Sequence, residues 1–395
     1  MNLLKQKIIE KIRTYGPISF ETFMEMALYY PGLGYYMKGS TEIGRRGDFY
    51  TSPHLHRIFG AMCGRQMEEM WGLMGYPDLF LVVEMGAGIG YLAKDMLEYL
   101  GRSAGKVRAA GGKKNIFDHL EYSIVERNPS VRLRQKELLR DFGDKVSWHS
   151  DLGELHPVVG CFLSNELLDA LPIRVIEMEG ELKEIYVAVS SPPARRGGAE
   201  EGADTVAFVE LKMPCSCEVK DYLQEFSLVF PRGYKTEVNL RMRDWLSETN
   251  DKLSEGFIMT IDYGYPSWDY YSEDRSRGTL LCYHRHQINE DPFRNVGEQD
   301  MTAHVNFSAL KKWGGEIGLK TIGFCPQGTY LVSLGIDEMI TELYGESCDP
   351  FETAKIKGLI LPQGLGESHK VMVHYKGKDE PKLRGFALRN QTGKL

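Results

Sequence analysis

The sequence predicts an α/β fold built on a parallel sheet with helices on both faces. Short apolar runs typical of strands alternate with helical patterns through the middle of the 395-residue chain, and this alternation indicates such a sheet. One run, LVVEMGAGIG at 81–90, ends in an acidic residue followed by glycine at every second position. A period-two pattern between 172 and 213 predicts an antiparallel hairpin inserted into the sheet domain.

The elements follow in order from the N-terminus. The first sixteen residues, MNLLKQKIIEKIRTYG, predict an amphipathic helix that Gly16 and Pro17 terminate. Seven core strands are expected at 79–84, 120–126, 145–148, 158–163, 257–262, 319–324 and 370–375. Helices are expected at 91–100 and 307–317, and surface loops at 101–115 and 191–204.

This pattern suggests a division of the chain into three parts. They are an N-terminal helical cap and lid at 1–60, a sheet core at 61–171 and 256–395, and an inserted substrate-recognition subdomain at 172–255. Inserted elements of this kind commonly carry substrate recognition.

The glycine-rich turn after the first core strand indicates a nucleotide-like ligand. Glu84 is followed by Gly86, Gly88 and Gly90, whose bare backbone a ligand can approach at the start of a helix. Dinucleotide folds want glycine at the sixth position of such a turn, but Tyr91 stands there, which weakens the case for NAD or FAD. The pattern instead resembles motif I of class I S-adenosylmethionine (SAM) methyltransferases, and this resemblance implies that Glu84 and the three glycines contact the cofactor. A tight turn without a ligand is the alternative.

Two acids after the following strands suit the rest of such a site. Glu126 ends the second strand, where a carboxylate can accept hydrogen bonds from both ribose hydroxyls. Asp151 follows the third strand, where this fold usually offers a polar side chain to the adenine amino group. The competing interpretations are a solvated strand-end acid for Glu126 and a helix N-cap for Asp151.

Composition limits the class of protein. The formal net charge of -7 argues against a nucleic-acid partner, and no apolar stretch is long enough for a membrane span. Seven cysteines without a CxxC pair suit a reducing compartment, so we expect a cytoplasmic protein.

Several longer strings resemble the MidA-like family, which includes a mitochondrial complex I assembly methyltransferase that modifies a protein arginine. They are GPISFETFMEMALYYPGLGYY, GRRGDFYTSPHLHRIFG, SNELLDALPIRVIE, GFIMTIDYG and GTLLCYHRHQINEDPFRNVGEQDMTAHVNF. The resemblance implies a seven-stranded, Rossmann-like class I methyltransferase fold, SAM as methyl donor, and a protein arginine as acceptor, in a respiratory complex I subunit or a similar partner. One departure is His54, which stands where the family usually has glutamate after TSP.

The acids near the predicted carboxyl edge are the candidate catalytic groups. Methylation of a guanidinium requires a group that orients it and receives a proton, which carboxylates can do. Glu166 and Asp169 follow the fourth strand and would share a face if the segment turns helically. Asn165, just before them, is expected to add a hydrogen bond to the cofactor or the acceptor. Asp262 ends the fifth strand and either orients the acceptor or braces Tyr263. Asp169 as a brace of its own turn is the alternative.

The segment GRRGDFYTSP is expected to fold over the cofactor as a lid. Its side chains Asp48, Thr51 and Ser52 would contact the methionine end of SAM, although plain loop packing is an equal alternative. We expect no metal site, because His284 and His286 on one strand face and His304 lack a further ligand at metal-binding spacing.

Other functions remain open at this stage. The chain could use SAM only as a structural ligand while assembling a partner, or it could methylate a small molecule. An NAD-dependent oxidoreductase is a more distant alternative. A homodimer is considered as a further partner.

Overall fold

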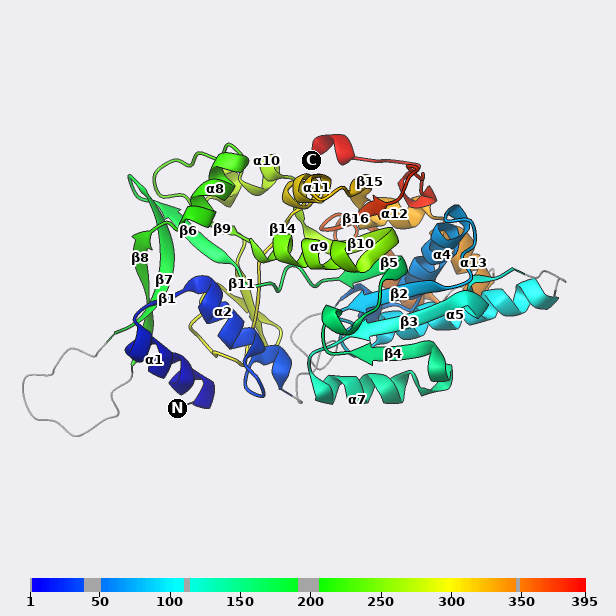
Figure 1. Cartoon of the computed structure of the whole chain (residues 1–395), viewed down its shortest axis with the longest axis horizontal. Helices are drawn as coiled ribbons and strands as arrows, with labels where there is room; N and C mark the ends of the chain where they lie inside the picture. The colour runs from blue at the N-terminus through cyan, green and yellow to red at the C-terminus, as the bar shows by residue number, and fades with distance from the viewer. Residues whose placement is uncertain (1, 39–50, 110–113, 191–205, 346–348) are drawn as a thin grey trace, which may run out of the picture. The chain divides into compact units, whose positions relative to one another are not determined.

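The computed structural model describes residues 2–38, 51–109, 114–190, 206–345 and 349–395. The chain forms two compact units (Figure 1). The first contains Met1–Thr41, Ala170–Arg241 and Tyr271–Ala303, and the second contains Glu42–Asp169, Met242–Tyr270 and His304–Leu395. The expected division differs from this one. The first N-terminal residues and residues 271–303 group with most of the insertion, whereas residues 51–60 and 242–255 group with the sheet.

The first unit packs two helices against an antiparallel sheet. Its elements are α1 (Leu3–Tyr15), β1 (Ile18–Ser19), α2 (Phe20–Tyr29), η1 (Tyr35–Met37), β6 (Arg174–Met178), β7 (Leu182–Ser190), β8 (Ala207–Pro214), α8 (Cys217–Glu225), β9 (Lys235–Val238), η4 (Glu273–Arg275), β11 (Leu281–His284), β12 (Gln287–Asn289) and β13 (Asp300–Thr302). Strands β6, β7 and β8 form the hairpin region expected from the period-two pattern. Apolar side chains of α1, α2, β6 and β7 share one core, which explains why the N-terminal segment belongs here.

The second unit is the predicted α/β domain. Its elements are α3 (Ser52–Leu55), α4 (Ile58–Leu73), β2 (Phe80–Met85), α5 (Tyr91–Ala109), α6 (Ile116–His119), β3 (Leu120–Val125), α7 (Pro129–Leu138), η2 (Arg140–Lys145), β4 (Val146–His149), η3 (Leu152–Glu154), β5 (Val158–Asn165), most of α9 (Arg241–Lys252), β10 (Leu253–Tyr265), α10 (Ser267–Tyr270), β14 (Val305–Asn306), α11 (Phe307–Glu316), β15 (Lys320–Pro326), α12 (Gln327–Ser333), α13 (Ile336–Tyr344), α14 (Pro350–Ile360), β16 (His369–Lys376), η5 (Arg384–Phe386) and η6 (Thr392–Lys394).

The central sheet of this unit has the strand order β15-β16-β10-β5-β2-β3-β4, and the short β14 pairs with β10. All pairings among β4, β3, β2, β5 and β10 are parallel, whereas β16 is antiparallel to both neighbours. Helices cover both faces, with α4 and α5 in one core and α11 against His374 on the opposite side. The expected strands therefore lie where the sequence placed them, within a few residues.

One helix is longer than expected. The sequence analysis ended it at Leu100 and predicted a loop at 101–115, but α5 continues to Ala109. Leu97, Leu100 and Ala104 are spaced three or four apart and are all buried, so the apolar face of the helix continues past Gly101. That prediction was wrong because two glycines were given more weight than this periodicity. The other predicted loop, at 191–204, lies outside the described residues.

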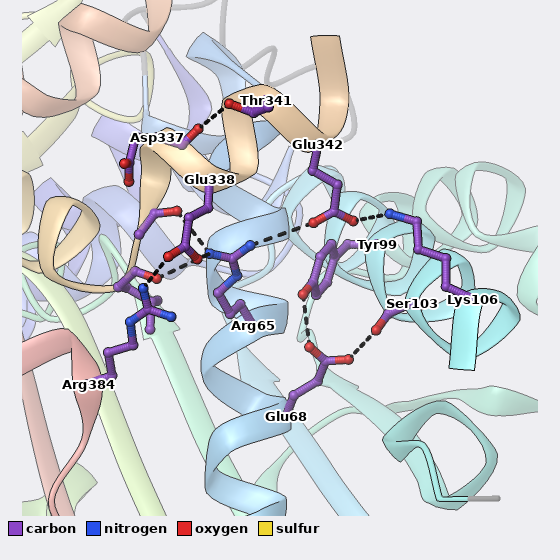
Figure 2. A network of polar contacts seen from close by, with 12 residues as sticks. Arg65, Glu68, Tyr99, Ser103, Lys106, Asp337, Glu338, Thr341, Glu342 and Arg384 are labelled. Atoms are coloured by element: carbon purple, nitrogen blue, oxygen red, sulfur yellow. Dashed lines mark hydrogen bonds and ion pairs between the residues drawn. The ribbon is translucent and has the colours of Figure 1, made fainter. Parts of the chain in front are cut away.

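A polar network joins helices α4, α5 and α13 of this unit (Figure 2). Arg65 on α4 donates to the carbonyl oxygens of Leu334 and Gly335 at 3.3 and 2.9 Å and pairs with Glu338 and Glu342 on α13. On α5, Lys106 reaches the same Glu342, and Tyr99 and Ser103 donate to Glu68 of α4. Arg65 is therefore the hub between α4 and α13.

Removing the hub should destabilise the unit more than removing a peripheral cation. We expect Arg65→Met to lower the free energy of unfolding by about 1–3 kcal/mol, because the carbonyl oxygens of the buried residues Leu334 and Gly335 lose a charged donor. Lys106→Met, at a side chain 65% exposed with one ion pair, should cost about 0.5 kcal/mol or less. Urea unfolding of both variants measures the difference, and equal losses would contradict the assignment of Arg65 as hub.

Candidate active site

The carboxyl ends of the parallel strands bring most of the predicted site residues to one edge of the sheet. The glycine turn follows β2, Glu126 follows β3, Asp151 follows β4, and Glu166 follows β5. In register, Ile261 of β10 lies beside Asn165, so Asp262 reaches the same edge. The common end of parallel strands is where open α/β sheets bind ligands.

The turn after β2 depends on its glycines. Gly86, Gly88 and Gly90 have φ angles of 71°, 53° and 95°, in the left-handed region that residues with a Cβ atom rarely adopt. A Cβ atom on Gly86 would also lie 2.8 Å from Leu167 Cδ1. The turn therefore requires glycine for its backbone conformation, and at Gly86 an added Cβ atom would also have to displace the end of the Leu167 side chain.

Glu84 lies beneath this turn. Its carboxyl is 2% exposed, and the Tyr122 hydroxyl donates to it at 2.7 Å. Burial raises the pKa of Glu84 to about 7, against the lowering effect of the Tyr122 hydrogen bond. The Glu84 carboxyl is therefore buried and bonded to Tyr122 of the neighbouring strand β3. Its contact with the cofactor stays a prediction.

Glu126 is positioned at the end of β3 by its own backbone and side chain. Its N–H donates to the His149 carbonyl at 3.0 Å, and its Oε1 accepts from the Asn128 N–H at 2.7 Å. Burial raises its pKa, and the Asn128 N–H and Arg132 oppose that effect. The carboxyl is thus partly desolvated and oriented through one oxygen, as a ribose ligand would require.

Asp151 behaves differently. Its side chain is exposed, and its Oδ1 accepts from the Gly153 N–H at 2.7 Å as the N-cap of η3. The capping interpretation raised for this residue is therefore observed, and contact with the adenine stays a prediction.

Glu166 has an unusual backbone for its residue type. Its φ angle is 50°, and its N–H donates to the Ile261 carbonyl at 2.8 Å, which holds the strained residue at the end of β5. Three groups approach the same oxygen, Oε1: Asn165 Nδ2 at 3.2 Å, the Ser52 N–H at 3.4 Å and His369 Nε2 at 3.6 Å. The side chain is only 9% exposed, so its position is well defined by these neighbours.

Asp262 anchors the segment that carries Glu166. Its Oδ2 accepts from the N–H groups of Leu167, Leu168 and Asp169 at 3.2, 2.9 and 3.4 Å, and its Oδ1 accepts from Tyr263 at 2.9 Å. Burial raises the pKa of Asp262, and the nearby carboxyls of Asp169 and Glu166 raise it further. The segment is an irregular turn and not a helix, so the expected helical face shared by Glu166 and Asp169 is not formed.

The last residues of the predicted lid segment, 51–53, also reach this edge. Thr51 Oγ1 lies 2.6 Å from His54 Nδ1, and the buried Ser52 hydroxyl donates to Gln327 Oε1 at 3.0 Å. His54 packs edge-on against Tyr91, and burial lowers its pKa while Glu166 opposes the shift. Asp48 lies outside the described residues, and the contacts of Thr51 and Ser52 with cofactor stay predictions.

Two residues at this edge escaped the sequence analysis. His369 begins β16 and lies in antiparallel register with Tyr263, which brings it from more than 200 positions away to Glu166. Gln327 begins α12 and is fully buried beside Ser52. Neither residue belongs to a recognisable motif. His369 could have been found only by pairing the last strand antiparallel to the strand that contains Tyr263.

The histidines considered for a metal are arranged differently from the expectation. His284 ends β11, but His286 has a φ angle of 61° and lies in the following turn, so the two do not share a strand face. Within the described ranges, no group of three or more His, Cys, Asp or Glu side chains could hold a metal ion.

These residues fit the groups of SAM. A turn with three left-handed glycines admits close backbone approach, Glu126 offers a desolvated carboxylate for the ribose, and Asn165 keeps a buried Oδ1 atom without a hydrogen-bond partner among the described residues. A central sheet whose last strand is antiparallel completes the match. The fold and site define a Rossmann-like, SAM-dependent methyltransferase.

Comparison with known proteins agrees. The sequence pattern of the family described as "Putative S-adenosyl-L-methionine-dependent methyltransferase" matches residues 62–325, about two thirds of the chain. The chain belongs to this family, and its cofactor is SAM. Among the described residues, none of the helices has the length and apolar character to cross a membrane.

Individual relatives are similar over most of their length. The proteins named "Protein arginine methyltransferase NDUFAF7, mitochondrial" of Rattus norvegicus and Homo sapiens are each 26% identical, over 91% of this chain and 81% and 80% of theirs. A crystal structure of a Burkholderia thailandensis protein bound to S-adenosyl-homocysteine is 29% identical, with a TM-score of 0.85 over 99% of this chain and 96% of that one. A native structure of a protein from that organism has a TM-score of 0.83 at the same identity and coverage.

The glycine turn gives a direct test of the cofactor site. We expect Gly86→Ala to weaken binding of S-adenosyl-homocysteine at least about tenfold, since a left-handed alanine costs about 1–2 kcal/mol and its Cβ would displace Leu167. Gly318→Ala is the matched control, with a φ angle of 84° and open space around the new atom. Calorimetric titration should show weakened binding only for Gly86→Ala, and unchanged affinity there would count against the turn as the cofactor site.

The raised pKa of Glu84 predicts a pH dependence of stability. The folded state favours the protonated acid, so stability is full below the ordinary value of 4.5 and falls as pH rises toward about 7. Glu84→Gln keeps an acceptor for Tyr122 but cannot ionise, so it should gain up to roughly 3 kcal/mol relative to the wild type between these pH values. Urea unfolding at pH 5 and pH 8 measures this gain, and parallel pH profiles would refute it.

Proposed function

We propose that the protein methylates an arginine side chain of a protein partner. The observation that carries the proposal is the Glu166 carboxylate, held at the methyl-transfer edge by a strained backbone and three contacts to one oxygen. The relatives from Rattus norvegicus and Homo sapiens are named protein arginine methyltransferases, which supports the same acceptor. The family resemblance favours a respiratory complex I subunit or a similar partner, and the cysteine pattern favours the cytoplasm.

Arginine makes a specific demand on such a site. Bound SAM supplies an electrophilic methyl group. A guanidinium is charged at neutral pH and is a poor nucleophile, so the protein must orient one nitrogen and accept the proton that this nitrogen loses. Carboxylates serve both purposes, because they accept short, directional hydrogen bonds from guanidinium N–H groups.

Glu166 has the capacity for this role. Its contacts with Asn165, Ser52 and His369 converge on Oε1, so Oε2 is the oxygen that would receive the acceptor N–H. His369 Nε2 lies 3.6 Å from Oε1, which is beyond hydrogen-bond distance, so we assign it to packing against the carboxylate. Asp169 is 4% exposed in the same turn and places a second carboxyl near the proposed guanidinium position.

Asp262 has a supporting part in this scheme. Its oxygens are occupied by four backbone N–H groups, three of which belong to the turn after Glu166. We assign it to holding that turn and not to proton transfer.

The decisive experiment combines labelling with a variant. Purified protein is incubated with methyl-labelled SAM and cell extract, and mass spectrometry identifies the labelled product and residue. We expect an arginine in a protein, and we expect Glu166→Gln to lower its methylation about 100-fold or more while S-adenosyl-homocysteine binding is retained.

Glu121→Gln provides the control, because it makes the same change at an exposed position of β3. Label in a small molecule would overturn the protein acceptor. Wild-type methylation by Glu166→Gln would overturn the role of Glu166. If SAM binds but no product is ever labelled, the chain uses SAM without catalysis.

A further inference from the structure

Gln135 is a fully buried polar side chain outside the residues assigned so far. It lies near the end of α7 and is 0% exposed. Its Nε2 donates to the Gly88 carbonyl at 2.7 Å, and its Oε1 accepts from Trp148 Nε1 at 3.1 Å. Both polar atoms of the amide are therefore satisfied, one by the glycine turn and one by β4.

The bond to Gly88 fixes a peptide group in the middle of the turn. Gly88 has a φ angle of 53°. Glycine adopts positive and negative φ angles about equally well, so its own backbone preference does not fix the orientation of this peptide. A trans peptide is planar, so its C=O and the following N–H point in opposite directions. When Gln135 holds the Gly88 carbonyl toward α7, the N–H of Ile89 is directed away from α7.

Helix α7 also lies beside the last glycine of the turn, Gly90, and the N-terminal end of α7 contacts Glu126. A Cβ atom on Gly90 would lie 3.6 Å from Gln135 Cγ and 3.5 Å from Leu138 Cδ2. At the other end, the N-cap residue Asn128 donates its N–H to Glu126 Oε1 at 2.7 Å. Helix α7 thus contacts both parts of the cofactor site that come from β2 and β3.

We propose that Gln135 is a positioning residue for SAM, which holds the Gly88–Ile89 peptide in the orientation that the cofactor requires. Gln135 itself contacts backbone and Trp148, so it acts through the turn. The amide is suited to this task because it donates to the carbonyl and accepts from the indole at once, which neither a carboxylate nor an apolar side chain of that size can do. The proposal concerns the cofactor only and is independent of the acceptor.

The test is binding of S-adenosyl-homocysteine, measured by calorimetry on the whole chain. Gln135→Met keeps the length of the side chain but removes both hydrogen bonds, and we expect about tenfold weaker binding. Gln66→Met is the matched control. Gln66 is also a 0% exposed glutamine on a helix of the same unit, but its amide bonds to Glu69 and Tyr330. We expect both variants to lower the melting temperature, and only Gln135→Met to weaken binding.

Two further variants separate the two hydrogen bonds. Gln135→Glu retains an acceptor for Trp148 and, when ionised, loses the donor to Gly88, so it should weaken binding at least as much as Gln135→Met. Trp148→Phe leaves the bond to Gly88 and should weaken binding less than threefold, roughly. These two variants also decide the question if Gln135→Met does not fold.

Wild-type affinity in folded Gln135→Met would overturn the proposal, and so would wild-type affinity in Gln135→Glu at a pH high enough to ionise the buried acid. Equal weakening by Gln66→Met would also overturn it, because the effect would then follow from lost stability. A failed methylation assay with intact binding bears on the acceptor and leaves the role of Gln135 standing.

Discussion

The site depends on the buried carboxylate of Asp262. The chain leaves β5 at Asn165 and must turn sharply at the sheet edge, where backbone N–H groups would be buried without partners. Asp262, on the neighbouring strand β10, accepts hydrogen bonds from three of them and from its own following residue. Because unpaired buried N–H groups are costly, this one side chain determines the path of the turn and hence the place of Glu166.

Much of this arrangement follows from the sequence. Apolar runs located the strands, and parallel strands align their carboxyl ends, so the order of the strands alone assigned the glycine turn, Glu126 and Glu166 to one edge. The glycines after β2 could be interpreted individually because left-handed backbone is nearly exclusive to glycine. These are properties of single residues and short segments, which a sequence records directly.

The missing parts are contacts between distant segments. His369 and Gln135 reach the site through strand register and helix packing, which no local pattern encodes. The extension of α5 past Gly101 is similar, since Phe117 packs against that glycine from a different element. Grouping of the N-terminal helices with the insertion likewise depends on a shared core formed by segments more than 100 residues apart.

Acids at strand ends illustrate why role is harder to predict than position. Glu237, near the end of β9 in the other unit, is also buried and accepts from the Thr279 and Leu280 N–H groups and the Thr279 hydroxyl. Asp262 and Glu237 thus both hold loops, although either would pass for a catalytic acid in the sequence. What separates them from Glu166 is how their oxygens are occupied, since Glu166 accepts through Oε1 from a single backbone N–H and one side-chain amide. A carboxylate already committed to several backbone amides cannot also take up and release a proton without losing the loop that it holds. Glu166 holds no loop in this way, because both of its acceptor bonds fall on Oε1.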